Sequence, residues 1–112
     1  MAAGLLNILI EQGATFSRTL TVESAPGTPI NLTGYTFAGK MRKNLTDTTA
    51  AVAFTLSVSS ASSGQVLWTL SATQTDALAP QVHRYDIEMT APGGTVTRIL
   101  EGEAWVSGSA TR

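Results

Sequence analysis

The segment spanning residues 82–106 constrains the fold of this chain more than any other stretch. Two runs of alternating side chains, 82–90 and 96–106, flank a Pro-Gly-Gly turn, which is the pattern of a β-hairpin. Apolar or small residues recur at every second position, with charged residues at most of the positions between them. The apolar set is Tyr85, Ile87, Met89, Leu100, Gly102, Ala104 and Val106. Because one face is apolar and the other charged, we expect an antiparallel sheet with one side in water.

Shorter alternating runs elsewhere in the chain predict further strands. They cover residues 6–12, 15–23, 35–43, 52–58 and 65–71, with a short extended piece at 30–34. Gly39 falls on the apolar face of its run, which indicates a bulge or a close backbone approach. One short helical turn is expected at 71–78, where either Ser71 with Gln74 or Thr73 with Asp76 can form a capping pair. This pattern is typical of an all-β sandwich or barrel with about seven to eight short strands.

The length and composition favour one globular domain. At 112 residues the chain can bury a single modest core, so we expect one domain over 1–112, with the sandwich in 5–107 and a loose tail at 108–112. Only 13% of the residues are charged, and Ser and Thr fill many outward positions, which favours packing against neighbours in an assembly. There is no basic leader and no apolar run of membrane-spanning length, so we expect synthesis in the cytosol and no membrane segment.

The charge pattern argues against nucleic-acid binding. The net charge is −1, whereas binding to phosphates requires an excess of Lys and Arg. Lys40, Arg42 and Lys43 form the main basic cluster, which we interpret as a solvated or salt-bridged face. Binding of single-stranded nucleic acid also requires exposed aromatic side chains on which the bases can stack. Most of the aromatic residues fall instead on inward positions, where they form a core: Phe16, Phe37, Phe54, Trp68 and Tyr85.

No pattern of catalytic or cofactor-binding residues is present. The chain has one histidine, His83, and no cysteine, so neither a His pair nor a Cys-ligated zinc site can form. It has no Gly-x-Ser-x-Gly elbow and no glycine-rich phosphate loop, and we expect neither an enzyme nor a cofactor. The four hairpin acids can gather on one side and hold a hard cation, or they can pair with basic residues across the strands or with a neighbouring subunit. These acids are Asp86, Glu88, Glu101 and Glu103, and the basic residues are Arg84, Arg98, Lys40 and Arg42.

A few residues stand out as candidates for a protein interface. Trp105 lies on the outward face of its run, so it is either covered by the tail or serves as an interface anchor. Arg18 lies on the apolar face of its run, so it either extends out at a sheet edge or reaches an acidic group across an interface. The complete set of candidates is Trp105, Arg18, Glu101, Glu103, Lys40 and Arg42.

Four phrases, in this order, are similar to one family. They are ILIEQGATF at 8–16, INLTGY at 30–35, the turn at 71–78, and YDIE at 85–88 followed by a Gly-Gly turn and TRILEG at 97–102. Together they resemble small virion proteins of tailed bacteriophages and prophages. They also resemble the immunoglobulin-like N-terminal domain of baseplate upper proteins, which fixes receptor-binding fibres to a tail. The resemblance covers residues 5–107.

The resemblance implies an immunoglobulin-like antiparallel β-sandwich that serves as a docking module without catalysis. Its partners would be other virion proteins, with many copies in a symmetric assembly, and it would reside in the virion after synthesis in the host cytoplasm. The chain ends directly after the expected sandwich, without the fibre-bearing extension of that family. An adaptor of the tail, baseplate or fibre and a capsid decoration protein therefore both stay open. A carbohydrate- or surface-binding module, with Trp105 and Tyr35 as stacking platforms, is the alternative from another class.

Overall fold

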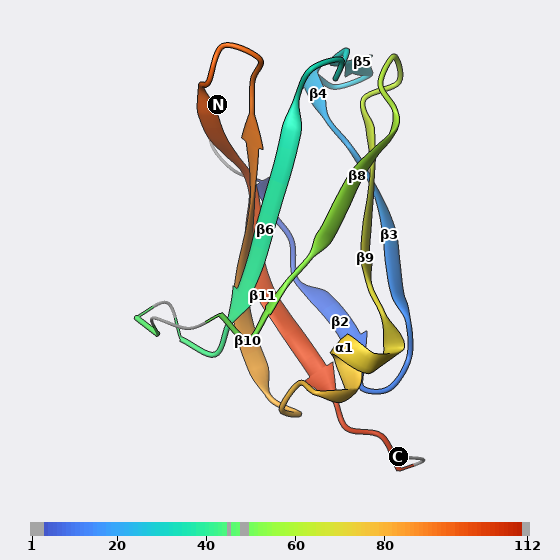
Figure 1. The fold of residues 1–112 in the computed structure, drawn as a ribbon, viewed down its shortest axis with the longest axis vertical. Helices are drawn as coiled ribbons and strands as arrows, with labels where there is room; N and C mark the ends of the chain where they lie inside the picture. Colours follow the sequence, from blue (N-terminus) through green and yellow to red (C-terminus); the bar gives the residue numbers. More distant parts are fainter. Residues whose placement is uncertain (1–3, 45, 48–49, 111–112) are drawn as a thin grey trace.

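The computed structural model describes residues 4–44, 46–47 and 50–110, and it is an all-β sandwich (Figure 1). The large sheet has six strands in the order β1-β11-β10-β6-β7, with β2 also pairing to β11, and the small sheet has the order β3-β9-β8. The strands are β1 (Gly4–Leu5), β2 (Ile8–Glu11), β3 (Phe16–Thr21), β4 (Glu23–Ala25), β5 (Thr28–Pro29), β6 (Thr36–Arg42), β7 (Val52–Ala53), β8 (Thr55–Ser60), β9 (Gln65–Leu70), β10 (Val82–Thr90) and β11 (Val96–Ser107). The predicted all-β fold class is confirmed.

The hairpin of β10 and β11 forms the centre of the large sheet, as the alternation predicts. β10 pairs antiparallel with β11 on one side and with β6 on the other. The inward side chains are buried, including Ile87 and Ala104, which have no exposed surface. The register shifts after Ile87, so that Ile87 opposes Leu100 and Glu88 opposes Arg98. Ile99 therefore forms a bulge between the two pairs.

The first strands of the chain lie beside the last, which the local pattern does not predict. β1 and β2 both run parallel to β11, with Leu5 opposite Glu101 and Ile8 opposite Ala104. Between them the chain passes so close to Gly102 that a side chain there would overlap the Leu6 carbonyl oxygen. The Tyr85 hydroxyl donates a hydrogen bond to that oxygen at 2.6 Å. This contact fixes the path of the chain from β1 into β2.

The core between the two sheets is organised around an aromatic cluster. Trp68 of β9 is 1% exposed and packs edge-on against Phe16 and Phe54, with ring centroids 5.4 and 5.2 Å apart. Its ring also lies 5.4 Å from that of Tyr85 in the large sheet. The predicted inward positions of these aromatic residues are confirmed, and Phe37 packs against the core while partly buried. The cluster joins the two sheets because its members come from both.

The run predicted as one strand at 52–58 divides between the sheets. β7 belongs to the large sheet and β8 to the small one, and Phe54 lies between them. The Phe54 amide donates to the Gly39 carbonyl at 2.9 Å, and the Phe54 ring then enters the core. A Cβ at Gly39 would lie 3.0 Å from the Asp86 carbonyl oxygen and 3.1 Å from the Phe54 ring. The close approach expected at Gly39 is therefore confirmed.

Two other segments differ from the sequence-based expectation. Residues 30–34 are not a strand, because the Asn31 side chain accepts from the Thr33 amide and supports a turn. Leu32 is 1% exposed and anchors this turn in the core. The preceding segment, which lies outside the predicted strands, forms the small hairpin of β4 and β5 around a turn at Pro26 and Gly27. These short pieces, and the splitting of longer runs, raise the number of strand segments above the seven to eight expected.

The expected helical turn is the helix α1 (Ala72–Asp76), capped by Ser71 and Gln74 in a reciprocal capping box. The segment after the last strand is less free than expected, because the Ser109 amide donates to the Gln12 side chain at 3.1 Å. Gln12 is itself buried and donates to the Leu78 carbonyl at 2.9 Å. Residues 111–112 of the predicted tail lie outside the described residues.

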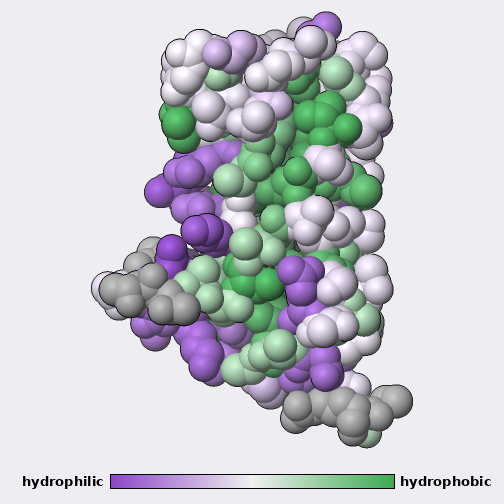
Figure 2. Space-filling view, viewed as in Figure 1, coloured by the Kyte–Doolittle hydropathy of each residue, from purple (hydrophilic) through white to green (hydrophobic). Residues whose placement is uncertain are grey.

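One side of the sandwich is open where the edges of the two sheets meet. β6 lies next to β8 along this side, and only the two residues of β7 extend the large sheet beyond β6. Figure 2 shows apolar side chains running as a broken strip along this face of the molecule. Phe37 and Leu56 are partly exposed here, and Val58 is exposed. Within the described part of the chain, no helix is long and apolar enough to cross a membrane.

Candidate docking surface

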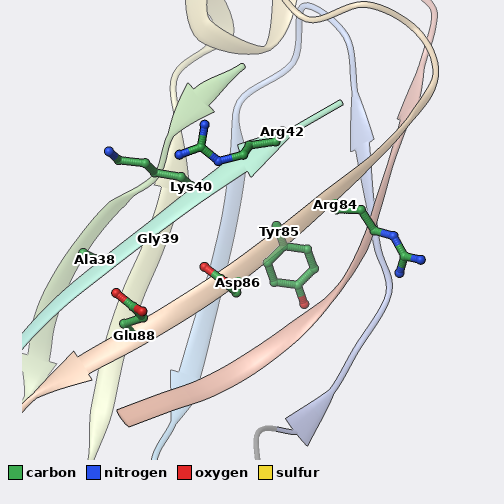
Figure 3. Close-up of a pocket in the computed structure, with 8 residues that line it drawn as sticks. All are labelled: Ala38, Gly39, Lys40, Arg42, Arg84, Tyr85, Asp86 and Glu88. Carbon is green, nitrogen blue, oxygen red and sulfur yellow. The ribbon is translucent and has the colours of Figure 1, made fainter. Parts of the chain in front are cut away.

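The outer face of the large sheet carries the charged residues that alternate with the core. β10 contributes Arg84, Asp86 and Glu88, and β6 contributes Lys40 and Arg42. A hollow of about 400 Å³ lies between these two strands (Figure 3). In this view Lys40 and Arg42 extend from β6 on one side of the hollow, and Arg84 extends away from them toward the opposite side. The hollow is shallow and lined by charges of both signs.

The hairpin acids lie on one face of the sheet, and an arginine forms ion pairs with two of them. Asp86 opposes Glu101 across the strands, and Arg98 forms ion pairs with both carboxylates at 3.3 Å. Both partners are substantially exposed, so each pair contributes at most about 1 kcal/mol. Among the residues that the structure describes, no group of three or more acids or histidines is placed to hold a metal ion. Of the two alternatives for these acids, the geometry favours cross-strand pairing.

The two basic candidates of β6 lie outside this ion-pair group. Lys40 opposes Asp86, and Arg42 opposes Arg84, so two like charges face each other in the register. The Arg42 guanidinium donates to the carbonyl of Asp47 at 3.1 Å instead of to a carboxylate. This contact holds it away from Arg84 (Figure 3). Strand β10 lies between β6, which carries Lys40 and Arg42, and β11, which carries Trp105.

An exposed apolar row crosses three neighbouring strands at one end of the same face. The row is defined by Val82 of β10, Trp105 of β11 and Leu9 of β2, which are direct neighbours in the register. Their side chains are 43%, 52% and 60% exposed. A contiguous cluster of exposed large apolar side chains, unlike single exposed ones, is typical of an interaction site. The outward position predicted for Trp105 is confirmed.

The surroundings of this apolar row are mainly acidic. The Trp105 indole N–H donates to the Glu103 carboxylate at 3.2 Å, which orients the ring on the sheet. In the neighbouring rows Glu103 opposes Arg84, and Glu11 opposes Ser107. The described residues after β11, 108–110, leave about half of Trp105 open to solvent. The role of Trp105 as an interface anchor stays a prediction, for which this exposed position leaves room.

Arg18 lies at a sheet edge, away from this apolar row. β3 pairs only with β9 in the described part of the chain, so it is an edge strand, and Arg18 is exposed. No ion pair involves Arg18 among the described residues, so the structure shows an arginine that extends out at an edge, and its contact with an acidic group across an interface stays a prediction. A second hollow, of about 310 Å³, separates Arg18 from Leu9 and Glu11 on the opposite strand β2.

His83 is the one fully buried titratable side chain among the described residues outside the aromatic cluster. It shares the inward face with Tyr85, and its Nδ1 lies 3.1 Å from the Gln81 carbonyl oxygen. Burial lowers the pKa of His83 below its ordinary value, and the nearby Lys43 charge lowers it further, against the opposing effect of the hydrogen bond. The native protein therefore favours the neutral imidazole. This agrees with a structural role for His83.

We expect the free energy of unfolding to fall as the pH decreases from about 6.5 toward the lowered pKa of His83. In that window the unfolded chain binds a proton that the native protein does not, and below the native pKa this loss is complete. Urea denaturation at several pH values between about 5 and 7.5 measures the slope. The variant His83→Gln lacks the single imidazole of the chain and should show a flatter profile. An unchanged slope in this variant would assign the pH dependence to other groups.

Two residues of the apolar row, Leu9 and Val82, were not predicted as site residues. Leu9 alternates with the buried Ile8 and Ile10, which was the available signal, but only the parallel pairing with β11 places Leu9 beside Trp105. Tyr35, proposed with Trp105 as a stacking platform, precedes β6 at the opposite end of the sheet. The length of β10 separates them by roughly 25 Å, so the two rings do not form one platform.

The chain was also compared with known proteins. No protein-family model matches it, and a search of curated proteins finds no match.

Proposed function

We propose that this chain is a non-enzymatic structural protein of a tailed-bacteriophage virion, most consistent with a component of the tail, baseplate or fibre adaptor. It docks other virion proteins through the outer face of its large sheet. The observation that carries the docking role is the apolar row of Val82, Trp105 and Leu9, exposed on three hydrogen-bonded strands, whereas the phage assignment rests on the resemblance of the four sequence phrases. A large indole held on a rigid sheet, with a polar rim, is the composition of a protein-interface anchor.

The strand order supports an immunoglobulin-like assignment of the sandwich. If the long strands are lettered along the chain, β3, β8 and β9 become B, D and E, and β6, β10 and β11 become C, F and G. The observed orders β3-β9-β8 and β11-β10-β6 then correspond to B-E-D and G-F-C. The first strand departs from the constant-type pattern, because it pairs with the last strand rather than with B. This architecture accords with the resemblance to baseplate domains.

A capsid decoration protein is the second candidate in the same class, because the same apolar row would bind a capsid lattice equally well. A carbohydrate-binding module has less support, since Trp105 and Tyr35 lie at opposite ends of the sheet. Localisation within the particle separates the first two candidates, and glycan binding that is lost in Trp105→Ala would favour the third.

We expect the chain to be present in multiple copies in particles purified from the phage or prophage that encodes it. Mass spectrometry measures its copy number, and immunogold labelling places it on the tail or the capsid. Trp105→Asp should reduce incorporation at least about tenfold, because an aspartate cannot fill the pocket of an aromatic anchor. Leu67→Asp, at an exposed apolar position of the small sheet, is the matched control and should be incorporated normally. Absence of the chain from purified particles would refute the proposal.

A further inference from the structure

β2 presents an unpaired strand edge next to the apolar row. Within the described part of the chain β2 pairs only with β11. The amides of Leu6 and Gln12 donate to Glu101 and Ser107 of β11, so the even-numbered residues of this segment direct their backbone groups toward β11. Because backbone groups alternate along a strand, the N–H and C=O of Leu9 point to the open edge. A hollow of about 310 Å³ lies beside this edge, lined by Leu9 and Glu11 of β2 and, across it, by residues 16–18 of β3.

We propose that this edge binds the same edge of a second copy of the chain, as an antiparallel pair centred on Leu9. In such a pair Leu9 opposes Leu9 of the second copy, and the two residues exchange both N–H···O bonds, since their backbone groups are those that face outward. The contact is isologous, so one two-fold axis relates the copies. The two large sheets then join into one continuous sheet.

The charges and the apolar surface of β2 are self-complementary in this register. Counting outward from Leu9, Glu11 opposes Asn7 of the second copy, so no two carboxylates face each other across the pair. The two-fold axis is perpendicular to the sheet, so the two apolar rows lie on the same face. Leu9 of one copy continues into Leu9 of the other, and Trp105 and Val82 follow on each side. The paired copies therefore present one apolar row of twice the length.

This inference deepens the proposed function, on which it rests for its biological use, because a symmetric virion assembly requires copies arranged about symmetry axes. The two can still fail separately. Incorporation into particles tests docking to other virion proteins, whereas pairing of the purified chain tests the β2 edge alone.

Single-cysteine variants test the register, because the natural chain has no cysteine. Opposed residues of a hydrogen-bonded antiparallel pair have Cα atoms about 5.5 Å apart, within the range that a disulfide spans. Purified Leu9→Cys should therefore form a cross-linked dimer under mild oxidation. Glu11→Cys is the matched control on the same strand, because its copies would be about 13 Å apart in this register. Thr19→Cys tests a different free edge, that of β3.

The expected result is a dimer yield at least about tenfold higher for Leu9→Cys than for either control, in variants whose circular dichroism matches the natural chain. Size-exclusion chromatography with light scattering on the natural chain should show a dimer whose fraction rises with concentration, and Leu9→Asp should shift it to monomer. Leu9 is 60% exposed, so this substitution leaves folding intact. Equal yields in all three variants, preferential cross-linking of Thr19→Cys, or a natural chain that stays monomeric at high concentration would each overturn the proposal.

Discussion

Replacing Gly102 by alanine should destabilise the protein by at least about 3 kcal/mol, a large part of the stability of a domain of this size. A Cβ at this position would overlap the Leu6 carbonyl oxygen, which is backbone and cannot rotate away. To make room, the segment between β1 and β2 must move away from β11. That movement breaks the hydrogen bond from the buried Tyr85 hydroxyl to Leu6, and a buried polar group left without a partner adds about 1–3 kcal/mol.

Equilibrium denaturation in urea measures this effect. Gly93→Ala is the matched control, because nothing lies within 4 Å of a Cβ built at Gly93 and no left-handed φ is required there. We expect this control to stay within about 0.5 kcal/mol of the natural chain. If both variants unfolded at the same urea concentration, the close approach at Gly102 would not contribute to stability.

The passage of the chain past Gly102 also connects the fold to the candidate docking surface. The Leu6 amide donates to Glu101, and the Asn7 side chain accepts from the Glu103 amide, so this segment is held on both sides of Gly102. Because these contacts hold the segment beside β11, β2 continues along β11 and places Leu9 next to Trp105. A variant that releases this segment should therefore lose the apolar row as well as stability.

The parts of the fold that could be predicted from the sequence are those determined by local alternation. The hairpin of β10 and β11 has its inward and outward residues where the period of two places them, and Trp105 is on the outward face for that reason. The capping box of α1 involves residues three positions apart, so it is also a local property. These features need no knowledge of which strands pair.

The parts that could not be predicted depend on pairing between distant residues. Asn7 and Glu103 are 96 positions apart in the sequence, and nothing in the composition of either segment specifies that they pair in parallel. The apolar row therefore appears in the sequence as three separate apolar residues. Phe54 illustrates the same difficulty, because the alternation continues through it while the chain changes sheets. Side-chain period reports which face is buried, but it does not report the partner strand.

Replacing Trp68 by alanine should lower the free energy of unfolding by about 3–5 kcal/mol, the effect of emptying the site of a large buried aromatic residue. Trp68 is the largest fully buried side chain among the described residues, and its ring contacts Phe16, Phe54 and Tyr85. Because these rings come from both sheets, the cavity would weaken the packing between the sheets rather than within one of them. Removal of the Trp68 side chain should therefore destabilise the whole sandwich in one cooperative transition.

A conservative variant separates packing from hydrogen bonding at this site. The Trp68 indole N–H is buried and has no hydrogen-bond partner among the described residues. Trp68→Phe would remove this unpaired donor while keeping an aromatic ring, so it should destabilise the protein less than Trp68→Ala does. Circular dichroism in urea measures all variants equally, because the chain has two tryptophans and fluorescence would change with each substitution. Trp105→Ala, at the exposed tryptophan, should unfold within about 0.5 kcal/mol of the natural chain. Equal unfolding of Trp68→Ala and Trp105→Ala would show that the aromatic cluster does not hold the two sheets together.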